Sequence, residues 1–156
     1  MKQISYYIVE RLHINKDTGN HSYNYHPKTR DELKELINEL INERGNDADL
    51  NDIDTSEITD MSYMFYRSIF NGDISNWDVS KVEDMGTMFQ YSEFTGKNGD
   101  ISQWDVSNVI DMYCMFYKSK FNGDISNWDV SNVKNMNNMF YKSPLEKNQP
   151  KWYKKK

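Results

Sequence analysis

Apolar and polar residues recur along most of this chain with a period of about 24 residues, which is typical of a tandem repeat. The string NGDISNWDVSNV at 122–133 returns as NGDISNWDVSKV at 71–82 and as NGDISQWDVSNV at 98–109. A weaker copy, DLNDIDTSEITDM, lies upstream, and SEFTGKNGD at 92–100 is a local insertion. We number four units from 1 to 4 by their first residues, which are Asp49, Asp73, Asp100 and Asp124.

The first half of each unit has apolar residues at its second, fifth, seventh and tenth positions. In unit 2 these are Ile74, Trp77, Val79 and Val82. This spacing is that of a leucine-rich repeat, in which a short strand alternates between buried and exposed side chains. The second half reads M-x-x-M-F, as in Met85, Met88 and Phe89, and predicts one side of a helical turn.

A final apolar residue closes each unit before a tight turn, and it is Phe70, Phe94, Phe121 or Leu145. Gly72, Gly99 and Gly123 each follow Asn, so we predict a positive φ at these glycines. Among the aligned apolar positions of the four units only Thr55 is not apolar. We interpret the Met and Trp columns as a stacked core rather than as a cofactor site.

Both ends of such a stack need cover. Residues 28–45 predict a helix with a Thr29–Glu32 capping box, a stop at Gly45 and an apolar stripe of Leu33, Leu36, Ile37, Leu40 and Ile41. Residues 3–26 read as a β-hairpin whose tyrosines Tyr6, Tyr7, Tyr23 and Tyr25 either pack or form a contact surface. At the other end we expect cover from Leu145, Trp152 and Tyr153.

The predicted fold class is therefore an α+β repeat: a short leucine-rich-repeat-like solenoid of four units, with an N-terminal β-hairpin plus a helix as its cap. The predicted divisions are a hairpin and capping helix at 1–48, the repeat at 49–143, and a C-terminal cap with a basic tail at 144–156.

The strings FNGDISNWDVSNV and NMNNMFYKS resemble the bacterial surface-protein repeat of Mycoplasma lipoproteins, which is related to BspA-like leucine-rich repeats. The resemblance covers about two thirds of the chain. It implies a solenoid with a recognition role and no enzymatic activity.

Composition adds expectations about the compartment. The apolar run near the N-terminus is too short for a signal-peptide core, and no stretch approaches the length of a membrane span. Cys114 is the only cysteine, so no intramolecular disulfide can form, and its variable unit position predicts a surface thiol. We expect a cytoplasmic protein, or one in the host cytoplasm if the source is viral.

Charge is unevenly distributed within a net charge of −5. Residues 49–143 carry 7 basic and 15 acidic side chains, so this section repels nucleic-acid phosphates and favours a partner with a basic surface. Residues 144–156 carry 5 basic and 1 acidic side chains. Contact with nucleic acid is therefore expected, if at all, only through this tail.

No motif for catalysis emerges from the sequence. The three histidines, His13, His21 and His26, lack metal-ligand spacing, and no nucleophile elbow or phosphate-binding loop occurs. We predict no enzymatic activity, no cofactor and no metal site.

A polar stripe remains once the apolar positions are assigned, and its Asp column has three interpretations. Asp can accept local hydrogen bonds and fix the stacking, bind Lys or Arg of a partner, or hold calcium between units, although the calcium-binding nonapeptide is missing. The first two are compatible. The predicted partner-binding residues are Asn76, Asp78, Ser80, Gln103, Asp105, Ser107, Asn127, Asp129 and Ser131.

The sequence thus predicts a non-enzymatic protein-interaction module that presents an acidic, polar face. One alternative is an acidic inhibitor, of the viral anti-defence type, of a nucleic-acid-handling enzyme. Another is a self-associating structural or adhesive protein. One exposed face of four units is smaller than a standard interface of about 800 Å² per partner. Either the partner also contacts the N-terminal hairpin or the edge loops, or binding is weak, or the protein self-associates. The insertion at 93–99 is a candidate specificity loop.

Overall fold

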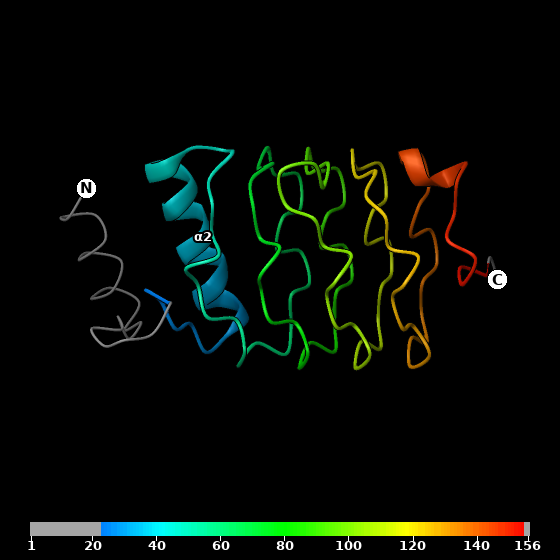
Figure 1. Ribbon diagram of the computed structural model, residues 1–156, viewed down its shortest axis with the longest axis horizontal. Helices are drawn as coiled ribbons and strands as arrows, with labels where there is room; N and C mark the ends of the chain where they lie inside the picture. The colour runs from blue at the N-terminus through cyan, green and yellow to red at the C-terminus, as the bar shows by residue number, and fades with distance from the viewer. Residues whose placement is uncertain (1–22, 155–156) are drawn as a thin grey trace.

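The computed structural model describes residues 23–154, and Figure 1 shows a row of stacked turns with one helix at its N-terminal end. Helix α2 spans Arg30–Arg44, and the short 3₁₀ helix η1 spans Pro144–Glu146. No β-strand forms within 23–154, where parallel pairing between units is confined to isolated bridges such as Asp84 with Asp111. The C-terminal end of the chain lies at the far end of the row from α2.

Helix α2 forms where the sequence predicts a helix. Thr29 Oγ1 accepts the Glu32 amide at 3.2 Å, and the Glu32 carboxylate accepts the Thr29 amide at 3.3 Å, so the capping box is present. Gly45 ends the helix with a φ of 93°, which glycine adopts without a Cβ clash. The predicted stripe is buried at Leu33, Leu36, Ile37 and Leu40, with Ile41 partly buried beside them.

The predicted fold class is wrong. The units form no sheet and no leucine-rich-repeat-like α+β solenoid, because aspartates turn the chain before a strand can extend. In unit 2, Oδ1 of Asp73, Asp78 and Asp84 accepts the amide two residues further on, at 2.9, 2.9 and 2.7 Å. Such local bonds compete directly with the hydrogen bonds of a strand ladder. The apolar spacing of a leucine-rich repeat is here produced by successive tight turns.

Most of the predicted N-terminal hairpin, including Tyr6 and Tyr7, falls in residues 1–22, which lie outside the described residues. In the part that is described, Tyr25 makes a parallel bridge to Ile53 of unit 1. Tyr25 is buried there, so this tyrosine packs rather than forming a contact surface.

The M-x-x-M-F segments are chains of turns rather than the predicted helical turns. Tyr63 and Arg67 have φ values of 58° and 54°. The amides of Met64, Tyr66 and Ser68 bond back three residues, at 3.3, 3.2 and 3.1 Å, while the alternate amides reach the next unit. Positive φ recurs at the same two places in later units, at Thr87, Tyr91, Cys114, Lys118, Asn138 and Lys142.

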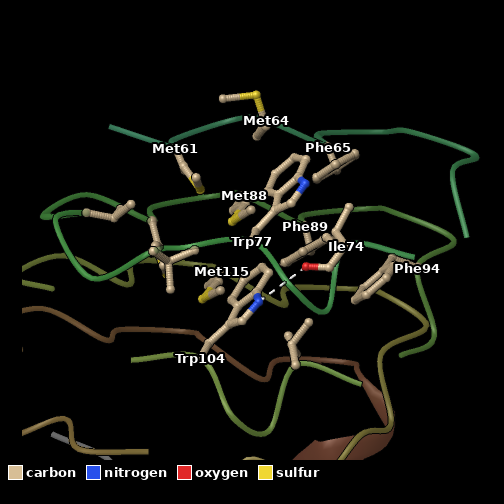
Figure 2. Close-up of a cluster of buried hydrophobic side chains, with 14 of the residues drawn as sticks. Met61, Met64, Phe65, Ile74, Trp77, Met88, Phe89, Phe94, Trp104 and Met115 are labelled. Carbon is tan, nitrogen blue, oxygen red and sulfur yellow. Dashed lines mark hydrogen bonds between the residues drawn. The ribbon is translucent and has the colours of Figure 1, made fainter. Parts of the chain in front are cut away.

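Successive units stack in register around one core. The rings of Phe65, Phe89, Phe116 and Phe140 stack with centroid distances of 5.4, 5.5 and 6.0 Å. Trp104 Nε1 donates to the Ile74 carbonyl of the preceding unit, a bond visible in Figure 2. The prediction of a Met, Phe and Trp core is therefore confirmed. Every predicted apolar position is buried except three half-buried ones in unit 4, namely Val130, Val133 and Met136.

The prediction of positive φ at the Asn-Gly pairs is wrong. Among the described glycines only Gly45 and Gly96 have positive φ. Close approach explains the glycines instead, because a Cβ at Gly72 would lie 2.0 Å from the Ala48 carbonyl oxygen. At Gly123 it would lie 2.7 Å from the Phe121 ring. These turns need a residue without a side chain because chain segments touch there.

Cys114 is buried, so the predicted surface thiol is wrong. Thr87, at the same place in unit 2, is buried as well. Both residues belong to the two middle units, which are covered by a neighbour on each side. Tyr63 and Asn138 hold this place in the first and last units and are exposed. Burial raises the pKa of the Cys114 thiol, which keeps it protonated and unreactive at neutral pH.

The predicted C-terminal cover is confirmed. Leu145 is buried, and the Tyr153 ring lies 4.9 Å from the Phe140 ring. Trp152 Nε1 donates to the Ile125 carbonyl at 2.9 Å. This repeats the bond from Trp128 to Ile101 one unit earlier, so the tail continues the indole column beyond unit 4.

Candidate functional site

The structure places the predicted polar stripe on the second turn of each unit. Asp78, Asp105 and Asp129 are exposed, and each Oδ1 accepts the amide of the Ser two residues on, at 2.9, 3.1 and 3.0 Å. The Ser80 and Ser107 hydroxyls also donate to these carboxylates, each at 2.6 Å. The Asp column therefore has a structural role as turn cap, which was one of the predicted interpretations. It leaves the second carboxylate oxygen facing outward.

The units of the stripe are tied to one another by asparagines. Asn108 Nδ2 donates to the Ser80 carbonyl at 2.7 Å, and Asn132 Nδ2 does the same to Ser107 at 2.7 Å. The stripe is consequently rigid along the stack, and its carboxylates keep fixed positions. Of the remaining predicted residues, Asn76, Gln103, Asn127 and Ser131 are exposed alongside.

Local hydrogen bonds favour the ionised form of two carboxylates of the stripe, Asp105 and Asp129. Hydrogen bonds from the hydroxyl and amide of Ser107 lower the pKa of Asp105, and Ser131 lowers the pKa of Asp129 in the same way. Within residues 23–154 no Lys, Arg or His forms an ion pair with these aspartates. The stripe therefore presents negative charge that is not neutralised within the described protein.

A second surface was missed by the sequence analysis. We call it the tyrosine ladder, and it consists of Tyr66, Tyr91, Tyr117 and Tyr141 with the cations Arg67, Lys118 and Lys142. Neighbouring tyrosine rings lie 6.3, 5.7 and 5.0 Å apart. The Arg67 guanidinium carbon lies 5.4 Å from the Tyr66 ring and 5.1 Å from the Tyr91 ring. Lys118 Nζ lies between Tyr91 and Tyr117, at 5.3 and 5.5 Å from their rings.

The signal for this ladder is the string M-F-Y-[RK]-S at 64–68, 115–119 and 139–143. Unit 2 departs from it with F-Q-Y-S, so Tyr91 stands where the other units have a cation. Its ring nevertheless fills the gap between Tyr66 and Tyr117. Alignment by letter alone places this tyrosine in the wrong column, and only the structure brings the four rings together.

The tyrosine ladder and the polar stripe face away from each other. The stripe belongs to the first half of each unit and the ladder to the second half. The apolar side chains of both halves meet in one core, as Phe65 and Trp77 do with a centroid distance of 5.8 Å. Exposed side chains of the two halves must then point in opposite directions. The stack is acidic on one face and aromatic with positive charges on the other.

The candidate specificity loop at 93–99, at the end of unit 2, is fastened to the end of unit 1. Thr95 bonds through its amide and hydroxyl to Asn71 Oδ1, at 2.9 and 2.8 Å, and Asn98 Nδ2 donates to the Asn71 carbonyl at 2.7 Å. Gly96 has a φ of 79°, and a Cβ there would lie 2.7 Å from the Phe121 ring. The loop is a fixed ridge rather than an adaptable one.

Residues 32–152 match the protein family described as "Mycoplasma protein of unknown function, DUF285". The chain belongs to this family. The match spans most of α2 and all four units, and it confirms the predicted relation to Mycoplasma-type repeats. No curated protein and no solved structure matches this DUF285 chain.

The described part of the DUF285 chain holds no cluster of three metal-ligating side chains. His26 Nδ1 lies 2.9 Å from Asp54 Oδ2, whereas His13 and His21 lie outside the described residues. Between residues 23 and 154, no helix combines the length and the apolar character needed to cross a membrane.

Proposed function

We propose that this DUF285 chain is a non-enzymatic protein-binding module. The observation that carries the proposal is the tyrosine ladder, in which Tyr66, Tyr91 and Tyr141 are exposed by 36%, 36% and 39%. Tyr and Arg are enriched in protein interfaces and at their energetic hot spots. The rings are already ordered by their neighbours, so binding costs little side-chain entropy. The relation to BspA-like surface repeats, which the sequence suggests, supports a recognition role.

The polar stripe supplies the second part of the proposal, a partner with a basic surface. Its carboxylates are rigid, ionised and without internal cations, so Lys or Arg of a partner gains charge-assisted hydrogen bonds without displacing any ion pair. The nine predicted residues remain the proposed contacts on this face. We place the function in the cytoplasm, as the sequence predicts, and pull-downs from separated cell fractions test that location.

The test compares three baits in pull-downs read by mass spectrometry. Tyr91→Ala with Tyr117→Ala removes the centre of the ladder, whereas Asp78→Asn, Asp105→Asn and Asp129→Asn together remove the charge of the stripe. Glu35→Gln on α2, an exposed residue, is the matched control. We expect the ladder variant to lose its partner by about tenfold or more, as hot-spot tyrosines do. Retention of the same proteins by all three baits contradicts the proposal.

A second candidate, self-association, is favoured by one observation. The acidic stripe and the cation-bearing ladder lie on opposite faces and repeat with the same unit spacing, so the stripe of one copy matches the ladder of another in both charge and period. Light scattering over a concentration series tests it. Growth in mass that disappears in the triple Asp→Asn variant supports self-association, and a constant monomer mass excludes it.

A further inference from the structure

The M-x-x-M-F segments give the stack a direction, because their alternate amides all point the same way. The amides of Met85, Thr87 and Phe89 donate to carbonyls of unit 3 at 2.9, 2.7 and 2.9 Å. The next junction repeats this, since the amides of Met112, Cys114 and Phe116 donate to unit 4 at 2.8, 3.0 and 3.0 Å. Each segment therefore has a carbonyl edge toward α2 and an amide edge toward the C-terminal end.

Helix α2 covers the carbonyl edge of unit 1 with cations. Arg30 Nε donates to the Ser62 carbonyl at 2.8 Å, and Lys34 Nζ donates to the Met64 carbonyl. These carbonyls correspond to those of Gly86 and Met88 in unit 2, which accept amides of unit 1. Side-chain cations thus stand where a preceding unit would place its amides. Two of the four carbonyls on this edge of unit 1 are bonded in this way, whereas those of Asp60 and Tyr66 accept no main-chain amide from residues 23–154.

The amide edge of unit 4 has no such cover. Met136, Asn138 and Phe140 hold the donor positions, yet their amides have no acceptor among residues 23–154. Only the fourth donor, the amide of Lys142, is bonded, and its acceptor is the Glu146 carboxylate at 3.1 Å. Met136 is half-buried and Asn138 is exposed, so this edge is reached by solvent and its amides remain open to an acceptor from a partner.

A groove runs along this edge, with a volume of about 760 Å³. Its apolar lining consists of Val130, Val133 and Met136 from unit 4 and of Trp152 and Tyr153 from the C-terminal segment. The first three are the apolar repeat positions that are not fully buried, whereas their counterparts in units 2 and 3 are covered by the following unit. Since Trp152 continues the indole column, the groove is the place of the second half of a fifth unit.

We propose that this groove binds a segment of another polypeptide that carries the same D-M-x-x-M-F repeat, held through its main-chain carbonyl groups. The junctions inside the stack show the geometry, in which three alternate carbonyls meet three alternate amides. Two cations, Lys134 and Lys154, and one carboxylate, Glu146, also line the groove, so its charged lining is positive by one and an acidic residue in the segment fits. Addition of an extended segment to an exposed main-chain edge is an established mode of peptide recognition.

The direction of the stack excludes simpler occupants. Two copies that meet through the same edge would oppose donors with donors, so a two-fold symmetric dimer gains no main-chain bonds there. On a second copy, Arg30 and Lys34 already bond the Ser62 and Met64 carbonyls, which are two of the three alternate acceptors that such a contact needs. The occupant is therefore a segment from a different chain with an uncovered carbonyl edge. The groove shares Tyr141 with the tyrosine ladder and none of the nine residues of the polar stripe. The ladder variant changes Tyr91 and Tyr117, which do not line the groove, so the two tests remain independent.

The experiment uses the full chain and a synthetic peptide with the sequence of residues 108–119, NVIDMYCMFYKS, with serine in place of its cysteine. Binding is followed by calorimetry, and main-chain amide exchange is followed by NMR. We expect saturable binding that slows exchange at Met136 and Asn138 by about tenfold or more, while the amides of Met112 and Cys114 stay slow throughout.

Two controls separate main-chain pairing from nonspecific apolar contact. A peptide with one acceptor carbonyl reduced to methylene keeps its side chains, and we expect about tenfold weaker binding from the lost hydrogen bond. Val133→Lys on the protein places a charge in the groove and should weaken binding at least as much. Ile69→Lys is its matched control, because Ile69 is exposed and does not line the groove.

Each outcome of these experiments either supports or overturns the proposal. Binding that is weakened by both changes, with protection at Met136 and Asn138, supports the proposal. Absence of binding, equal affinity for the reduced peptide, or protection elsewhere overturns it. If the protein alone dimerises and protects the same amides, the occupant is a second copy and the proposal is wrong. The reduced peptide acts on the unaltered protein, so the test holds even if Val133→Lys fails to fold.

Discussion

Both ends of this stack leave apolar side chains and main-chain polar groups to be covered, and the two ends differ in how completely this is done. At the N-terminal end, α2 brings four buried apolar residues and two cations, so the core is covered and two carbonyls of the edge of unit 1 are bonded. At the C-terminal end, Leu145, Trp152 and Tyr153 cover the core, but three amides of unit 4 stay unbonded and three apolar residues stay half-buried. A repeat stack built on directional hydrogen bonds therefore needs chemically different caps, cations for carbonyls and acceptors for amides.

Removal of each cap should show the largest difference. Deletion of residues 1–45 exposes the core face that Leu33, Leu36, Ile37 and Leu40 cover. At about 1.5–3 kcal/mol for each side chain the gross loss is roughly 6–12 kcal/mol, comparable with the net stability of a whole domain. We expect unfolding or aggregation by circular dichroism and light scattering. Deletion of residues 147–156 should lower the denaturation midpoint but leave a folded protein. Equal stability of both truncations would show that the ends do not differ.

The stacked rings of Phe65, Phe89, Phe116 and Phe140 allow the stability cost of the same substitution to be compared inside the stack and at its C-terminal end. Phe116 stacks between Phe89 and Phe140, with a neighbour on each side. Phe116→Ala should therefore cost about 3–5 kcal/mol of unfolding free energy in urea titrations. Phe140→Ala should cost less, because Trp152 and Tyr153 lie beside it and can shift into the space. A larger loss at Phe140 than at Phe116 contradicts the idea that the C-terminal end is the looser one.

Lys34→Met probes the cation cap itself. Met keeps much of the apolar stem but leaves the Met64 carbonyl unbonded, so the unfolding free energy should fall by about 1–3 kcal/mol. Glu146→Ala at the other end exposes the Lys142 amide to water and should cost less than about 1 kcal/mol. Both values come from chemical denaturation of the single variants. A neutral Lys34→Met result shows that apolar cover alone stabilises this end.

The third turn of each unit begins with an acidic residue in units 1 to 3, at Asp60, Asp84 and Asp111, and with Asn135 in unit 4. A change in this column should have the smallest effect on the unfolding free energy. Burial, and then the charges of Asp60 and Asp111, raise the pKa of Asp84. The folded protein therefore holds this proton more tightly than the unfolded chain, and stability falls as pH rises from the unfolded pKa through the folded one. Asp84→Asn keeps the acceptor for the Gly86 amide and removes the charge. It should stabilise at pH 7 by on the order of a few tenths of a kcal/mol, with no gain near pH 3.

Asp124 is the matched control, because its pKa is shifted in the opposite direction from that of Asp84. Hydrogen bonds from the amide and hydroxyl of Ser126 lower the pKa of Asp124, so its contribution is present above the unfolded pKa and is lost as pH falls through the folded one. Asp124→Asn should therefore not stabilise at pH 7. Unit 4 already carries the proposed change, because Asn135 holds the place of Asp84 there and donates through Nδ2 to Asp111 at 3.2 Å.

The polar stripe and the tyrosine ladder were not equally visible in the sequence. The stripe follows from its repeated letters, and the Asp-Ser pairs implied the local hydrogen bonds that the structure contains. The ladder depends on Tyr91, which stands one place out of register. Its position is decided by the rings of neighbouring units, and pattern alignment within one chain does not contain that information.

Local signals were sufficient for the unit length, the buried positions and helix α2, because burial alternation and capping depend on residues a few places apart. The same signals could not decide the conformation of each unit. Apolar spacing was the same for a strand as for successive Asx turns, and the competition between them was settled by carboxylates that cap turns and by amides that bond to the next unit. The burial of Cys114 likewise depended on having a neighbour on both sides. The direction of the stack, and with it the open amide edge, was decided only by tertiary structure, because a main-chain amide in one unit finds its acceptor some 24 residues away.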